Sequence, residues 1–185
     1  NAISLTLSAS PNTLNSFPFQ FFIDMQVKLG INSLEINIFI NNSSEDRMPF
    51  SLGLHPYFQV SMLNNIAIRG LSDTCINHLN MTKDLTRNQL KNLKYGIDFL
   101  TTSKDKGLVE LIDLDNFESI HMYAKKPMDL VVAWTDPPRK MVCLEPWTSP
   151  RNSLNSGDRT LFLDPGETKE LCCKFVFNKL NRPYK

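Results

Sequence analysis

Two titratable side chains of this sequence are each followed directly by a proline. His55 lies within SLGLHPYF before Pro56, and Glu145 ends the run KMVCLE before Pro146. A residue before proline is driven into extended backbone, and proline donates no backbone hydrogen bond, so each side chain is predicted at a strand end or bulge. An imidazole and a carboxylate held in this way suit acid and base catalysis on one bound molecule. The competing interpretation is that both segments are ordinary turns that leave a sheet.

The segments that must position this pair have the two-residue period of β-strands. In FFIDMQVKL, the apolar residues Ile23, Met25, Val27 and Leu29 share one predicted face. A turn containing Gly30 joins this run to LEINIFINN, which predicts an antiparallel hairpin. The same period returns in five later runs: 108–113, 119–124, 129–134, 140–145 and 170–177.

Helical spacing is convincing only in DLTRNQLKNL (84–93), and a shorter helical turn is expected in RNSLNS after Pro150. Many strands at short spacing, without alternating helices, predict an all-β fold, an antiparallel β-sandwich. Because no repeat, low-complexity tract or linker is visible, we expect a single domain over 1–185. LDPGE (163–167) predicts a turn between two strands, and polar loops are predicted near 41–47, 103–107 and 149–158.

Length, charge and cysteine usage restrict the classes of function. The chain has 185 residues, enough for one domain with a core, and its net charge of +1 indicates neither nucleic-acid nor membrane binding. Three histidines and four cysteines at long separations form no metal signature, so we expect no metal. The cysteines are interpreted as reduced thiols, which favours a cytoplasmic protein, and the N-terminus does not have the pattern of a signal peptide.

Several motifs together resemble the aldose 1-epimerase, or galactose mutarotase-like, family: FPFQFFIDMQVKL, MPFSLGLHPYF, IDFL, LVVAWT and CLEPWTSPRNSLNSGDRTLFLDPGETKEL. The resemblance implies the family fold, a large antiparallel β-sandwich or supersandwich, over nearly all of the chain. It implies interconversion of the α and β anomers of a hexose without a cofactor. His55 would be the general acid and Glu145 the general base, and we expect them to face each other across a gap about one monosaccharide wide. Asp98 would contact sugar hydroxyls.

Other residues are weaker candidates for binding a sugar. Trp147 is expected to offer an apolar face to a pyranose ring, and Tyr57 follows the His-Pro pair; core packing is the alternative for the tryptophan. Arg151 is expected to contact hydroxyls or the phosphate of a hexose 6-phosphate, unless it is a solvated loop residue. An exposed position on a strand face is the alternative for Asp98.

The remaining candidates are expected to be structural: His78 and His121, which have no recognisable partner spacing, and Trp134, for which core packing is favoured.

The chain also departs from the family, whose members are longer. It begins where roughly their first third would have passed, so we expect a partial sandwich that lacks N-terminal strands and a sugar-binding arginine. Exposed strand edges of such a chain would be prone to pairing with other chains. A non-catalytic carbohydrate-binding protein and an inactive fragment therefore remain as alternatives. The sugar, its phosphorylation and the oligomeric state are left open.

Overall fold

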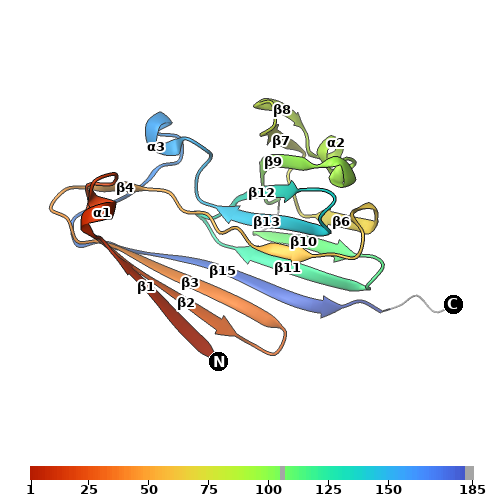
Figure 1. Ribbon diagram of the computed structural model, residues 1–185, viewed down its shortest axis with the longest axis horizontal. Coiled ribbons are helices and arrows are strands. Elements are labelled where there is room, and N and C mark those ends of the chain that lie inside the picture. The colour runs from red at the N-terminus through yellow and green to blue at the C-terminus, as the bar shows by residue number, and fades with distance from the viewer. Residues whose placement is uncertain (105–106, 182–185) are drawn as a thin grey trace.

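The computed structural model describes residues 1–104 and 107–181, so part of the loop predicted at 103–107 lies outside the described residues. Antiparallel strands form two main sheets, as the all-β prediction requires (Figure 1). The seven-stranded sheet has the order β1 (Ala2–Ser8), β2 (Phe21–Leu29), β3 (Ser33–Asn42), β15 (Thr168–Lys179), β11 (Glu118–Ala124), β10 (Leu108–Asp113) and β6 (Ile66–Arg69). The six-stranded sheet has the order β5 (Tyr57–Gln59), β13 (Met141–Trp147), β12 (Leu130–Thr135), β9 (Ile97–Thr102), β7 (Thr74–Asn77) and β8 (Thr82–Leu85).

Short elements complete the fold. A two-stranded sheet pairs β4 (Met48–Phe50) with β14 (Leu161–Leu163). The helices are α1 (Pro11–Leu14), α2 (Thr86–Leu90) and α3 (Ser153–Ser156), with single 3₁₀ turns at Leu63–Asn65 and Leu93–Tyr95. Among the described residues, no helix has both the length and the apolar character needed to cross a membrane.

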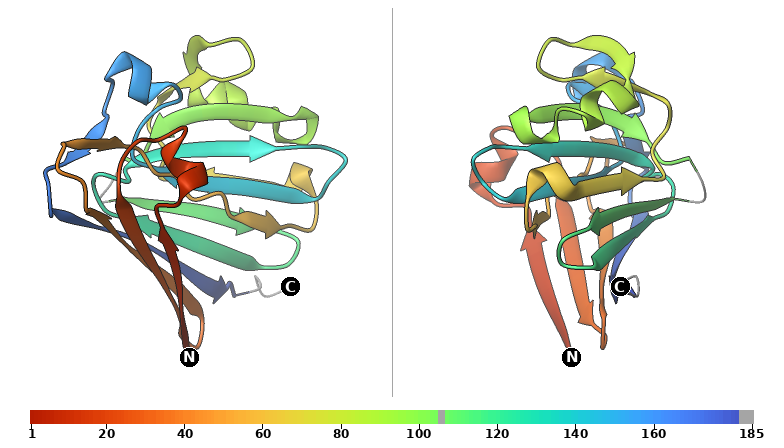
Figure 2. Two further views of the ribbon diagram at one scale, coloured as in Figure 1. Left: turned by 60° about the vertical axis from the view of Figure 1, so that its left-hand side comes forward. Right: turned by 90° about the vertical axis from the view of Figure 1, so that its right-hand side faces the viewer.

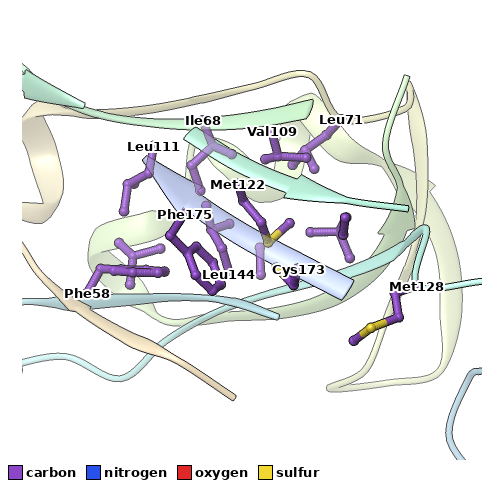
Figure 3. Close-up of a cluster of buried hydrophobic side chains, with 14 of the residues drawn as sticks. Phe58, Ile68, Leu71, Val109, Leu111, Met122, Met128, Leu144, Cys173 and Phe175 are labelled. Atoms are coloured by element: carbon purple, nitrogen blue, oxygen red, sulfur yellow. The ribbon is translucent and has the colours of Figure 1, made fainter. Parts of the chain in front are cut away.

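The hydrophobic core lies between the two main sheets (Figure 3). Phe58 and Leu144, from the six-stranded sheet, face Met122 and Phe175 of the seven-stranded sheet, and the rings of Phe58 and Phe175 lie 5.4 Å apart. Because side chains alternate along a strand, the residues between these core positions point away from the core. On β13 this alternation buries Leu144 in the core and directs Glu145 to the outer face of the sheet.

The first strands extend beyond the part of the sandwich covered by the second sheet (Figure 2). β2 and β3 form the hairpin predicted from the alternation, with Leu29 opposite Leu34. β1 adds to this hairpin as the edge strand, and all seven of its residues are exposed, including Ile3, Leu5 and Leu7. The seven-stranded sheet therefore ends in an edge whose apolar side chains are open to solvent.

The helix predicted over 84–93 is wrong in its extent. Residues 84 and 85 belong to β8, and the helix α2 covers only Thr86–Leu90 before a separate 3₁₀ turn. Pairing of β8 with β7, where Asp84 lies opposite Cys75, overrides the local helical spacing. The short helix after Pro150 is confirmed as α3, and LDPGE forms the predicted turn between β14 and β15, with Gly166 at φ +76.

The prediction that Pro146 ends its strand is also wrong, because β13 runs on to Trp147. The carbonyl of Pro146 accepts a hydrogen bond from the amide of Leu54 at 3.1 Å. In a strand, the N–H and C=O of one residue point to the same side, so the missing N–H of Pro146 faces the 51–55 segment. Pairing of Pro146 with Val131 of β12 therefore continues without a lost hydrogen bond.

Candidate active site

His55 and Glu145, ninety positions apart in the chain, lie side by side on the outer face of the six-stranded sheet. His55 Nδ1 is 3.4 Å from Glu145 Oε1. The imidazole is half exposed, whereas only 2% of the carboxylate side chain is exposed. The pair borders a cleft of about 510 Å³ between the 51–55 and 149–155 segments, which Trp147 and Arg151 also line. A buried carboxylate and an accessible imidazole thus face the same cleft.

Aromatic rings hold the imidazole of His55 in place. It stacks on Tyr57 with the two ring planes 4° apart and the centroids at 4.8 Å. The ring of Trp134 meets it edge-on at 5.7 Å. Pro56 restricts the backbone between the histidine and β5, as predicted from the sequence. The core packing expected for Trp134 is wrong, because this residue is only partly buried and its ring contacts His55 and Tyr57.

Trp147 and Gly53 hold the carboxylate of Glu145. Trp147 lies two residues further along β13, on the same face, and its indole Nε1 donates a 3.1 Å hydrogen bond to Glu145 Oε2. Gly53 forms a bridge with Trp147 and leaves room for the indole. A Cβ atom at position 53 would lie 2.5 Å from Cδ1 of Trp147. Only glycine therefore allows the indole to occupy this position without movement.

The surroundings of Glu145 favour its protonated form. Burial raises the pKa of this carboxyl, and the nearby charge of Asp98 adds to the increase. The hydrogen bond from Trp147 and the charge of Arg151 act in the opposite direction, and the net result is a pKa of about 7. A carboxyl with this pKa can both release and accept a proton near neutrality, which a general base and its reverse step require.

Cys143 lies close enough to this pair to raise the question of a metal. The donor atoms of His55, Cys143 and Glu145 all lie within 4.8 Å of one another. Burial and the charge of Glu145 raise the pKa of the Cys143 thiol to about 12. Metals bind the thiolate rather than the thiol, so this cysteine is a poor ligand as it stands.

A second carboxylate, Asp98, is held by two cationic or hydrogen-bonding groups. Its Oδ1 contacts His78 Nδ1 at 2.8 Å, and its Oδ2 accepts a 2.9 Å hydrogen bond from Arg151 Nη2. Burial works to raise the pKa of Asp98, but the hydrogen bond and charge of His78, together with Arg151, outweigh it and lower the pKa. Arg151 is an exposed loop residue, as the alternative interpretation holds, but its guanidinium also contacts Asp98 and lines the cleft.

The register of the strands explains why these residues meet. Asp98 lies opposite Trp134, Trp134 opposite Cys143, and Cys143 opposite Tyr57, which forms one row across the sheet. His78 follows β7 directly, where Asn77 pairs with Phe99, so it extends the same row beside Asp98. The contact between His78 and Asp98 was not predicted from the sequence, because it becomes visible only once the β7–β9 pairing is known.

Comparisons with known proteins agree with this architecture. A family profile described as aldose 1-epimerase matches residues 1–175. The structure of the Slr1438 protein of Synechocystis sp. PCC 6803 superposes with a TM-score of 0.91 at 29% identity, covering 96% of this chain and 62% of that one.

Two further solved structures share the fold. A galactose mutarotase-like protein of Clostridium acetobutylicum has a TM-score of 0.81 at 18% identity and covers 97% of this chain and 63% of its own. A galactose mutarotase-like protein of Lactobacillus casei ATCC 334 has a TM-score of 0.78 at 18% identity, covering 96% and 70%. A search of curated protein sequences finds no match. The chain thus spans somewhat more than three fifths of the first two of these structures.

Proposed function

Because the chain belongs to the aldose 1-epimerase family, we propose that it interconverts the α and β anomers of an aldose by acid–base ring opening. The observation that carries this proposal is the contact between His55 and Glu145 beside an open cleft, with 3.4 Å between Nδ1 and Oε1. The two groups lie closer together than the predicted gap, about one monosaccharide wide. The closer approach still suits the reaction, because the two oxygens that exchange protons are bonded to the same carbon.

In the proposed reaction, protonated His55 gives its proton to the ring oxygen as the bond between C1 and that oxygen breaks. Glu145 takes the proton of the C1 hydroxyl as the aldehyde forms. After rotation about the C1–C2 bond, the hydroxyl attacks the other face of C1, and both protons return. Nδ1 of His55 faces Glu145, which leaves Nε2 for the ring oxygen. No net charge or proton is consumed, and each group is expected to contribute roughly 10²–10⁴-fold.

The charges beside the cleft favour a neutral sugar over a hexose 6-phosphate. Arg151 is the cationic side chain that lines the cleft besides His55, and Asp98 already engages it at 2.9 Å. A phosphate group would need a cluster of arginines or lysines with free hydrogen-bond donors. Trp147 also lines the cleft and is proposed to contact the C–H face of the ring. Because all four cysteines are free, we also propose a cytoplasmic location.

Polarimetry on freshly dissolved α-glucose, α-galactose and glucose 6-phosphate tests the proposal. The wild-type chain should accelerate the drift to equilibrium, and His55→Ala and Glu145→Gln should each remove the acceleration while leaving the circular dichroism spectrum intact. His121→Ala is the matched control, since that histidine also contacts a glutamate, Glu110 at 3.2 Å, on the seven-stranded sheet. Equal acceleration by the wild type and both site variants would refute catalysis by His55 and Glu145. Saturable sugar binding without acceleration would support the carbohydrate-binding alternative.

A further inference from the structure

His78 is tied to Asp98 by both its backbone and its side chain. Its amide donates a 2.8 Å hydrogen bond to the carbonyl of Asp98, and its Nδ1 lies 2.8 Å from Oδ1 of the same residue. Only 1% of the His78 side chain is exposed, and the ring packs near that of Trp147, with 6.3 Å between centroids. Because an ionised carboxylate only accepts hydrogen bonds, Nδ1 must carry the proton of this contact.

Exposure increases stepwise from His78 toward the cleft. The exposed fraction of the side chain is 1% for His78, 15% for Asp98 and 48% for Arg151. Each carboxylate oxygen of Asp98 has one protein partner, which leaves further lone pairs for a hydroxyl. Arg151 has five N–H donors in a rigid fork, so its contact with Asp98 fixes its plane and leaves other donors free of Asp98. The contacts thus run from buried His78 through Asp98 to the accessible guanidinium of Arg151.

We propose that His78 is a positioning residue, which fixes Asp98 and through it Arg151 in the orientation that binds the hydroxyls of the sugar. This inference rests on the proposed function, since it concerns the ligand of the same cleft. His78 itself lies behind Asp98 and does not touch the sugar. Without it, the carboxylate can rotate about its terminal torsion, and Arg151 loses the fixed partner that aims it into the cleft.

A double-mutant cycle distinguishes positioning from a general contribution to folding. His78→Ala should raise KM by about tenfold and change kcat less, because a contact made in both the ground state and the transition state is lost. In an Asp98→Asn background the same substitution should add almost nothing, since the group it orients no longer has its charge. His78→Asn should restore most of the wild-type KM, because its amide nitrogen can occupy the place of Nδ1. His121→Ala is the control and should leave KM unchanged.

Carbon-13 NMR of the aspartate carboxyls supplies a readout that does not depend on turnover. His78→Ala should raise the pKa of Asp98, because the hydrogen bond and charge that lower it are removed. If the wild-type chain does not turn over sugar, the proposed function fails, and calorimetric dissociation constants for the same sugars replace KM in the cycle. Equal effects of His78→Ala in the two backgrounds, or an unchanged pKa of Asp98, would overturn the positioning role. If His78→Ala does not fold, His78→Asn and His78→Gln decide, since only the first should retain wild-type affinity.

Discussion

Replacing Glu145 by glutamine should remove a decrease in the free energy of unfolding that the wild type shows as the pH rises. The carboxyl has only 2% of its side chain exposed, and its pKa rises from the ordinary value of 4.5 to about 7. Burial is the main cause, followed in the same direction by the charge of Asp98. Glutamine has nearly the same shape and can still accept the hydrogen bond of Trp147 through its carbonyl oxygen.

The sign follows from which state holds the proton. Between pH 4.5 and about 7 the folded state keeps a proton on Glu145 that the unfolded chain has released. The folded state then binds more protons, so the free energy of unfolding falls as the pH rises through this window. The rise of the pKa from 4.5 to about 7 corresponds to a loss of about 3 kcal/mol in the free energy of unfolding. Below pH 4.5 both states are protonated and the stabilising contribution is complete; above about 7 it is lost.

Urea unfolding of the wild type and of Glu145→Gln, at a series of pH values across this window, measures the effect. The stability of the variant relative to the wild type should increase by about 3 kcal/mol from the acid to the alkaline end, because titrating groups remote from Glu145 cancel in the difference. Trp147→Phe removes the hydrogen bond that lowers the pKa of Glu145. The free energy of unfolding of this variant should therefore continue to fall to a higher pH than that of the wild type. Parallel stability curves for the wild type and Glu145→Gln would refute the assignment of a raised pKa.

Two further predictions concern packing. Gly53→Ala should destabilise the fold by about 1–3 kcal/mol in thermal or urea unfolding, because the new methyl would lie 2.5 Å from Cδ1 of Trp147. Unchanged stability and tryptophan fluorescence would contradict this account. The wild type should self-associate with increasing concentration in sedimentation velocity experiments. The reason is that β1 is an edge strand without a charged residue, and its Leu5 is 49% exposed. Leu5→Lys should reduce the association, whereas Met62→Lys, at an exposed site away from β1, should not; equal association of all three proteins would rule out this edge.

Local alternation predicted the longer strands β2, β3, β10, β11, β12, β13 and β15, but it missed β1 and the shorter strands, such as β6, β7 and β9, and the continuation of β13 through proline. The hairpin of β2 and β3 follows from residues that are close in the chain, and its register agrees with the apolar faces seen in the sequence. The extent of β13 depends on the direction in which the amide of Pro146 would point, which only the neighbouring 51–55 segment determines. The helix predicted over 84–93 fails for a similar reason, since two of its residues pair with a strand. In each case a partner from elsewhere in the chain decides the local structure.

The residues of the candidate site also differ in whether local sequence or a distant partner identifies them. His55 and Glu145 were identifiable because each carries its own restraint, the proline that follows it. His78 carries no such signal; its partner Asp98 is reached only when β7 pairs with β9 in one particular register. A shift of β7 by one residue against β9 would turn the side chain of His78 to the other face of the sheet and away from Asp98, whose own orientation is fixed by the pairing of β9 with β12. The proposed acid–base pair was therefore recognisable as a candidate from local motifs, whereas the contact of His78 with Asp98 depends on strand register. For this reason, the consequences of replacing His78 test the sheet topology as directly as they test the chemistry of the cleft.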